Sequence, residues 1–337
     1  MMTGDLFGVP FTDLLRLAQA HLLLSGCAVL VAILVGLPIS LWAAQDRRAR
    51  SLLLGAIGLM QTIPGLALLA LFYPLLLLIG QSTGLPIPAL GFLPALLALS
   101  IYALLPIVRN GVAAITGIDP ALVEAAKGLG MTRRQRVFHV ELPLGAPVIL
   151  AGIRTAAVWT IGTATLATTI GQPSLGDLIF SGLQTENWRR VLIGCLAAAL
   201  LAILVDGLLA LLESGLATRS RTRLGAGLLL LLTVLLSLSL PFAGQSRSAG
   251  PQAGRTIIVG PKNFSDQYIL AEAIEARLRA AGYRTERRDN LGSTIAYRAL
   301  AAGDIDVYVD YSGTLWANVL SRKDTPSSEA MLETLTA

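Results

Sequence analysis

Long apolar stretches, separated by short polar segments, fill most of the chain up to residue 242. A helix that crosses a bilayer needs about 20 mainly apolar residues, and five or six stretches meet this requirement. They cover about 21–44, 52–79, 90–115, 145–170, 191–212 and 224–242. The pattern predicts a mainly α-helical membrane protein with five or six transmembrane helices.

Positive charge gathers in alternate loops between these stretches. Arginines or lysines follow the first stretch in QDRRAR, the third in the segment 124–143 and the fifth in TRSRTR. Positively charged loops mark the cytoplasmic side of a membrane protein. These three loops are therefore expected in the cytoplasm, and the N-terminus and the part after residue 243 are expected outside. NWRR, in a loop expected outside, is an exception to the pattern.

Composition agrees with the membrane assignment. The 337 residues are 54% hydrophobic and 14% charged, with a mean hydropathy of +0.68, whereas soluble domains carry about 25% charged residues. Cytoplasmic loops account for the net charge of +5, so no nucleic-acid partner is expected. The sequence holds no ligand-spaced His and Cys cluster, no G-x-x-x-x-G-K-[ST] phosphate loop and no paired acids inside the membrane. It therefore predicts no metal, cofactor or catalytic site, and ATP hydrolysis would belong to a separate subunit.

The chain changes character after residue 243. Residues 244–254, GQSRSAGPQAG, have the composition of a flexible linker, which divides a membrane domain, 1–243, from a tail, 255–337. In the tail, strands are predicted at TIIVGP, YRTERR and DIDVYVDY, and helices at SDQYILAEAIEARLRAAG and STIAYRALAAG. Ser265 or Asp266 is expected to cap the first of these helices.

The alternation of strands and helices in the tail predicts an α/β domain with a largely parallel sheet. Its length suffices for one lobe at most, whereas a clamp that closes on a solute needs two lobes. We therefore expect either a fragment of a longer chain or a lobe without its partner.

Two groups of polar residues lie inside the apolar stretches. Gln61 and Pro64 belong to QTIP in the second stretch. A proline breaks the helical hydrogen-bond ladder, and the freed carbonyl groups need partners or water, so QTIP either lines an aqueous translocation path or serves packing. Arg154 and Asp206 stand at similar depths in the fourth and fifth stretches, where charges are usually paired. They predict an ion pair between packed helices, with a structural or a gating role.

The basic segment 124–143, EAAKGLGMTRRQRVFHVELP, has a regular spacing of small, turning and apolar residues. The pattern is E-A-A, three residues, G, nine residues, an aliphatic residue, one residue and L-P, carried by Glu124, Ala125, Ala126, Gly130, Val140, Leu142 and Pro143. It predicts a short amphipathic helix, a turn at the glycine and a second segment that Leu-Pro stops before the next span. The alanines allow close docking into a partner's groove, and Glu124, Arg133 and Arg134 can fix the register by charge.

The spacing of this segment resembles the EAA loop of the permeases of ABC importers. The resemblance implies the type I importer permease fold and a cytoplasmic ABC ATPase that docks on residues 124–143. It also implies a homodimer, because one permease copy supplies only half of a translocation path.

A narrower resemblance extends over most of the chain. QTIPGLALLAL, GIRTAAVWTIGTATLATTIG and LGDLIFSGL are similar to permeases for glycine betaine, carnitine and choline. VGPKNFSDQYILAEAI and DIDVYVDYSGT are similar to the start of the solute-binding proteins of that system. GQPSLG in place of a more glycine-rich turn, and Asp310 in place of glutamate, depart from the family pattern. The resemblance implies that the cleft-facing residues of the lobe are Asn263, Gln267, Thr294, Tyr311 and Thr314.

These observations predict the permease subunit of an ATP-driven importer in the inner membrane of a bacterium. A tethered lobe outside the cytoplasm would bind a quaternary-ammonium osmoprotectant, a cation without hydrogen-bond donors that proteins hold on aromatic faces. Two alternatives stay open. One is the same machinery for another zwitterionic or cationic solute, such as a trimethylated histidine derivative or an amino acid. The other is a membrane-anchored solute sensor, which has no need of a segment that docks an ATPase.

Overall fold

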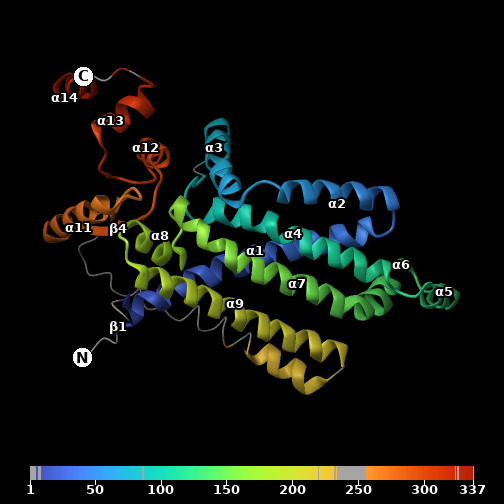
Figure 1. Ribbon diagram of the computed structural model, residues 1–337. Coiled ribbons are helices and arrows are strands. Elements are labelled where there is room, and N and C mark those ends of the chain that lie inside the picture. The colour runs from blue at the N-terminus through green and yellow to red at the C-terminus, as the bar shows by residue number, and fades with distance from the viewer. Residues whose placement is uncertain are drawn as a thin grey trace.

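The computed structural model describes residues 5–6, 9–85, 87–218, 220–230, 233, 256–322, 324 and 326–336. Long helices run side by side in a bundle, and the tail lies at one end of it (Figure 1). The bundle is built on α1 (Phe11–Ala43), α4 (Phe92–Thr116), α7 (Leu142–Ala164) and α9 (Trp188–Ala217). Helix α4 packs between α1 and α7, and α7 packs between α4 and α9.

Glycines allow the bundle helices to approach closely. A Cβ atom at Gly111 of α4 would lie 2.8 Å from the Cβ of Ser40 in α1. A Cβ atom at Gly152 of α7 would lie 2.5 Å from the Cβ of Asn110 in α4. Non-bonded carbon atoms attract best at about 3.5–4.0 Å, so both contacts require glycine.

Five helices among the described residues are long and apolar enough to cross a membrane, namely Phe11–Ala43, Gly65–Thr83, Phe92–Thr116, Arg133–Ile170 and Trp188–Ala217. They confirm the first, third, fourth and fifth predicted stretches. Of the sixth, residues 224–230 and 233 are helical, and the others lie outside the described residues.

The second predicted stretch is not one helix, and this prediction was wrong. It divides into α2 (Arg47–Gln61) and α3 (Gly65–Thr83). The division falls at Thr62–Pro64 because Pro64 has no N–H with which to continue the ladder of α2. Helix α3 stands across the bundle, whereas α2 runs along it (Figure 1).

Hydrogen bonds to helix α4 stabilise the break between α2 and α3. Pro106 also lacks an N–H, which leaves the carbonyl of Tyr102 without its partner in α4. That carbonyl accepts a hydrogen bond from Nε2 of Gln61 at 2.8 Å, and the Tyr102 hydroxyl donates in turn to the carbonyl of Ile63. Side chains thus satisfy these carbonyl groups.

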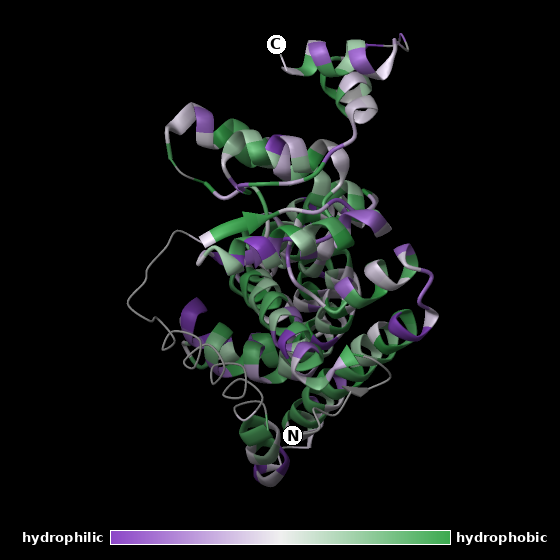
Figure 2. Cartoon of the chain, turned by 90° about the vertical axis from the view of Figure 1, so that its left-hand side faces the viewer, coloured by the Kyte–Doolittle hydropathy of each residue, from purple (hydrophilic) through white to green (hydrophobic). Residues whose placement is uncertain are grey.

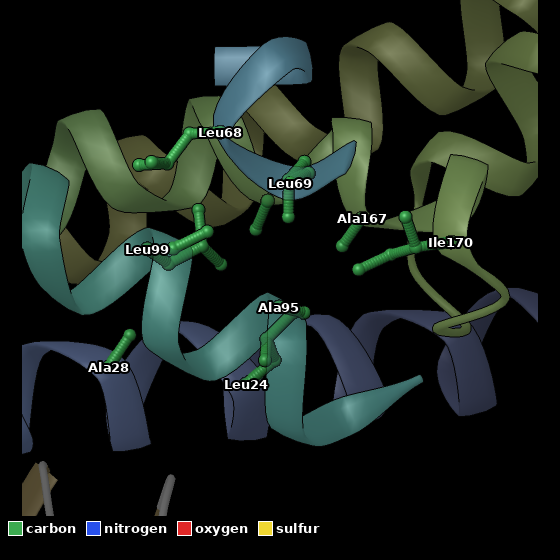
Figure 3. Close-up of a cluster of buried hydrophobic side chains, with 10 residues drawn as sticks. Leu24, Ala28, Leu68, Leu69, Ala95, Leu99, Ala167 and Ile170 are labelled. Atoms are coloured by element: carbon green, nitrogen blue, oxygen red, sulfur yellow. The ribbon is translucent and has the colours of Figure 1, made fainter. Parts of the chain in front are cut away.

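The start of α3 covers a buried apolar cluster that α1, α4 and the 3₁₀ turn η2 (Thr165–Ile170) complete. Figure 3 shows Leu68 and Leu69 of α3 on one side of Leu99, with Ala28 of α1 on the other. The cluster consists of Leu24, Ala28, Leu68, Leu69, Ala95, Ala98, Leu99, Ala164, Ala167 and Ile170, each at most 4% exposed.

The connections between helices fall at opposite ends of the bundle (Figure 1). One end carries α5 (Pro120–Gly128) and α6 (Arg133–Arg136), which precede α7. The other end carries α8 (Gly176–Gln184), the hairpin of β1 (Asp5–Leu6) and β2 (Val9–Pro10), and the tail. The segment 124–143 and the tail are therefore separated by the length of the bundle.

The tail is an α/β lobe, as predicted. Strands β3 (Thr256–Val259) and β4 (Arg284–Arg287) pair in parallel, and α11 (Ser265–Ala280) connects them. Helix α12 (Ser293–Ala302) follows β4, and α13 (Ser312–Thr314), the π turn η3 (Leu315–Val319) and α14 (Ser328–Thr336) complete the described part. Figure 2 shows the apolar residues that dominate the bundle and the more mixed helices of the lobe.

Two predictions about the lobe were wrong. DIDVYVDY does not form a third strand: it makes one parallel bridge, Val259 to Val307, and then leaves the sheet as Asp310 pairs with Lys262. Neither Ser265 nor Asp266 caps α11. Phe264 occupies the N-cap position without a side-chain bond, because both polar side chains have partners elsewhere.

The lobe and the bundle share a hydrophobic core. It joins Tyr73, Leu76, Ala89 and Leu90 of the membrane domain with Leu291, Ala296, Ala299 and Ile305 of the lobe. Leu291 and Ile305 are at most 1% exposed. The lobe is thus seated on the outer parts of α3 and α4 by apolar packing.

Candidate functional site

The first part of the segment 124–143 lies on the short helix α5, and local residues determine where this helix begins and where the chain turns after it. Asp119 caps α5 by accepting the N–H of Ala121 at 2.9 Å, and Pro120 occupies the first turn, where a missing N–H costs nothing. Ala126 is buried, while Glu124 and Ala125 are exposed. At Gly130 the backbone turns through a φ of 73°, a left-handed conformation that favours glycine.

A second helical arm follows the turn. Thr132 and Gln135 form a reciprocal capping box at its start, and Arg133 and Arg134 are exposed on it. Leu129, 78% exposed, and Phe138, 58% exposed, stand among these cations. This end of the bundle therefore presents an apolar surface with a basic border, which suits a protein partner.

Leu142 and Pro143 do not stop this arm, contrary to the prediction. Helix α6 continues through the π turn η1 (Val137–Glu141) into α7. A proline ring inside a helix collides with the carbonyl four residues earlier. The widened turn just before Pro143 relieves that collision, since the N–H of Leu142 reaches back five residues to the carbonyl of Val137.

Arg154 and Asp206 form the predicted ion pair between α7 and α9. Nε and Nη2 of Arg154 donate to Oδ1 and Oδ2 of Asp206 at 2.5 and 2.7 Å. Glu213, which the sequence reading missed, accepts from Nη1 of Arg154 at 3.3 Å. Glu213 follows Asp206 by seven residues, so two turns of α9 bring both carboxylates to one face. The three side chains, called the ion cluster below, are 36%, 34% and 29% exposed.

A group of side chains in the lobe, called the mouth below, places a cation between two aromatic rings. It consists of Lys262, Phe264, Asp266 and Tyr311. Lys262 is fully buried and pairs with Asp310. Its Nζ lies 5.6 Å from the ring centroid of Phe264 and 5.3 Å from that of Tyr311. Both distances are within the range of cation–π attraction, so these rings provide a surface that accepts positive charge.

Two of the predicted cleft residues meet at one carboxylate. The Tyr311 hydroxyl donates to Asp266, and Nε2 of Gln267 lies 3.3 Å from the same oxygen. The hydrogen bond from Tyr311 lowers the pKa of the Asp266 carboxyl below its ordinary value. Oε1 of the buried Gln267 has no hydrogen-bond partner among the described residues.

The other predicted cleft residues have different positions. Thr314 ends α13, and its N–H donates to the carbonyl of the N-cap residue Tyr311 at 3.0 Å. The N–H of Asn263 donates to the carbonyl of Leu291 at 3.3 Å, which ties that residue to the start of α12. The side chain of Thr294 lies outside the described part of the structure.

Sequence reading missed Lys262, Phe264 and Asp266 as members of this mouth. The signal for them was present, because the apolar run TIIVGP is followed at once by KNFSD. A surface hollow of about 580 Å³ lies elsewhere, on α11, and is lined by Tyr268, Ile269, Glu272, Ala273, Ala276 and Arg287.

Polar contacts join the lobe to the membrane domain beside the shared core. The Ser265 hydroxyl donates to the carbonyl of Gln184 at the end of α8. Nδ2 of Asn290 donates to the Thr168 hydroxyl at 3.0 Å, and that hydroxyl donates to Asp177. Burial raises the pKa of the Asp177 carboxyl from its ordinary 3.8 to about 7, and the bond from Thr168 partly opposes this rise.

Comparison with known proteins gives the chain two family matches. Residues 36–218 match the binding-protein-dependent transport system inner membrane component. Residues 255–337 match the substrate binding domain of ABC-type glycine betaine transport system.

Two relatives carry these domains in different combinations. The choline transport system permease protein OpuBB of Bacillus subtilis (strain 168) is 39% identical over 63% of this chain and 92% of its own length. The ergothioneine transport permease/ergothioneine binding protein EgtU of Helicobacter pylori (strain G27) is 33% identical over 88% of this chain. This chain covers 52% of that protein, so it spans about half the length of the relative that shares both domains.

A solved structure shows the same fold. The MetNI methionine ABC transporter in inward-facing conformations superposes with a TM-score of 0.53 at 19% identity, over 61% of this chain and 97% of that one. The membrane domain thus has the fold of a type I importer permease. The chain is a multi-pass membrane protein that belongs to the family of inner membrane components of binding-protein-dependent transport systems, joined in one polypeptide to a substrate-binding domain.

Proposed function

We propose that this chain is the membrane-spanning subunit of an ATP-driven importer that takes up a quaternary-ammonium osmoprotectant. The observation that carries the proposal is the placement of two surfaces at opposite ends of one helical bundle. One end presents the segment 124–143, and the other end holds the solute-binding lobe in contact with α3, α4 and α8. An importer needs this arrangement, because solute and nucleotide act on opposite sides of the membrane.

The end with segment 124–143 faces the cytoplasm in this proposal. Its arginines follow the positive-inside rule, and its exposed leucine and phenylalanine would enter a groove of a separate ABC ATPase. The lobe then lies outside the cytoplasmic membrane of a bacterium. Two copies of the membrane domain enclose the translocation path. Helix α7 of each copy would transmit the movement of the ATPase subunits to the helices that line this path.

The mouth of the lobe supports a cationic solute. Phe264 and Tyr311 already hold the ammonium of Lys262 at cation–π distance, and Tyr311 remains 47% exposed. A trimethylammonium group can use the same ring because it needs no hydrogen-bond partner. The relatives named for choline, carnitine and glycine betaine transport agree with this chemistry.

A second cargo is favoured by one observation. A relative that carries both domains on one chain is named for ergothioneine, which fits a trimethylated histidine derivative as the solute. A membrane-anchored sensor fits less well, because the chain keeps a helical arm, a glycine turn and an exposed apolar surface at the end opposite the lobe. A sensor does not use such a surface.

Solute binding and uptake by the full chain test the proposal. We expect saturable binding of glycine betaine, choline, carnitine or ergothioneine by the full chain in detergent, measured by calorimetry, and ATP-dependent uptake of the same solute in cells that lack other importers for it. Tyr311→Ala should abolish binding. Tyr283→Ala is the matched control, since Tyr283 has similar exposure, 46%, but lies at the far end of α11. Equal binding by both variants would contradict the assignment of the mouth.

A further inference from the structure

The helix that leads from segment 124–143 into the membrane contains one turn that is wider than the others. From Arg133 onward the chain is helical through α6, η1 and α7. Within η1 the bond from Leu142 N–H spans five residues, to Val137, whereas an α-helix spans four. Such a π turn amounts to one extra residue in an α-helix, and π turns are rare and frequently lie at functional sites.

An ion pair crosses this turn. Nε of Arg136 lies 2.7 Å from Oε1 of Glu141, and the two side chains are 19% and 10% exposed. Residues five apart lie about 140° apart around the axis of an α-helix and do not face each other. The pair therefore forms only while the turn is wide. Neither residue belongs to the spaced pattern that identified the segment.

The turn sets the angle between the docking arm and the span. Helix α7 is held against α4 at two glycines: a Cβ atom at Gly145 would lie 3.0 Å from the Cβ of Ala114, and Gly152 is packed still more closely. The exposed arm before the turn has no comparable packing among the described residues. Narrowing the turn to an α-turn would leave α7 in place and rotate the arm by about 100°, with a shift of about 1.5 Å.

We propose that Arg136 and Glu141 form a lock that keeps the π turn, and that this turn fixes the direction in which the docking arm presents Arg133, Arg134 and Phe138 to its partner. Both are positioning residues for coupling, and the inference rests on the proposed function. While the Arg136–Glu141 pair is formed, the arm and α7 move together as one rigid body when the partner displaces the arm. With the lock open, the arm can swing without moving α7, so ATP is hydrolysed without uptake.

Four variants of the full chain, each assembled with its ATPase, test the lock. Arg136→Gln and Glu141→Gln open it. Arg136→Glu combined with Glu141→Arg restores a pair of reversed sign. Deletion of His139 removes the extra residue and brings Arg136 and Glu141 to a spacing of four, which suits an ion pair on a regular α-helix. His139→Ala keeps the chain length and separates loss of the ring from loss of the residue. Arg221→Gln, in another basic loop, controls for loss of positive charge.

The readouts are co-purification of the ATPase, the rate of ATP hydrolysis and solute uptake per ATP hydrolysed. We expect the two single variants to retain the ATPase and its hydrolysis but to lose uptake per ATP by about tenfold. The reversed pair should recover most of that loss. The deletion variant should fold, keep its ion pair and stay coupled, because a regular α-turn with one residue fewer points the arm in nearly the wild-type direction.

The outcomes separate the two proposals. If the wild-type chain shows no ATP-dependent uptake, the proposed function fails. If the wild type is coupled and both single variants are equally coupled, the lock is overturned. If a single variant does not fold, spin labels at positions 134 and 148 of the deletion variant give the arm-to-span distance directly. A distance that differs from the wild-type distance would then overturn the inference.

Discussion

Replacing Asp206 by asparagine should lower the free energy of unfolding by about 1–3 kcal/mol. Removal of one partner from a fully buried ion pair costs about 3–5 kcal/mol, because it leaves a charge without compensation. The cost is smaller in the ion cluster, where each side chain is about one-third exposed and Glu213 still accepts from Arg154 at 3.3 Å. Glu213→Gln removes only this longest contact and should cost about 0–1 kcal/mol.

The double variant, Asp206→Asn with Glu213→Gln, shows whether the two carboxylates share Arg154 or contribute to stability independently. Without both carboxylates, Arg154 stands unpaired beside α9, so the loss should exceed the sum of the single losses by about 1–2 kcal/mol. The free energy of unfolding would be measured on the full chain in bicelles. Asp13→Asn, which removes an exposed carboxylate from the first turn of α1, is the control.

Additive losses, within about 0.3–0.5 kcal/mol, would refute this reasoning, since Arg154 would then not bridge the two acids. Unchanged stability of Asp206→Asn together with altered uptake would assign the pair to gating instead of structure. Both outcomes can be read from the same set of proteins.

Three further predictions concern the turn, the lobe contact and the broken helix. Gly130→Ala should cost about 1–2 kcal/mol, because a φ of 73° strains any residue with a Cβ, while the space around that Cβ is open; thermal melting gives the cost, and unchanged stability would show that the turn adapts. The pKa of Asp177 is raised from 3.8 to about 7, so the folded state binds the proton more tightly and stability should fall as the pH rises from about 4 to about 7; melting of the full chain against pH measures this, and Asp177→Asn should flatten that part of the curve. Tyr102→Phe should cost about 1–3 kcal/mol, because it leaves the carbonyl of Ile63 without its donor; a smaller loss in chemical unfolding would mean that water replaces the hydroxyl.

The local patterns of the sequence predicted what depends on local residues. Hydropathy located most of the spans, and the spacing from Glu124 to Pro143 predicted a helix followed by a turn at Gly130, because both are properties of a contiguous stretch. The Arg154–Asp206 pair was also predictable, since two lone charges of opposite sign at matching depth have few other partners.

The features that were missed depend on contacts between distant segments. Pro64 indicated a break, but Gln61 and Tyr102 hold it only because Pro106, on another helix, frees a carbonyl. Leu-Pro was expected to end a helix, but a π turn just before Pro143 lets the helix continue into α7. The third strand of the lobe was lost to the pairing of Asp310 with Lys262, which alternation of residues does not reveal.

The core that the lobe shares with the bundle has a consequence for how the protein is made. A ribosome completes the helices first, and the lobe emerges only after Leu76 and Leu90 have taken their places. Leu291 and Ile305 can then pack against those side chains. A lobe synthesised alone would expose these apolar residues to water and would tend to aggregate with other copies of itself. The fusion thus supplies each newly made lobe with a surface to fold against.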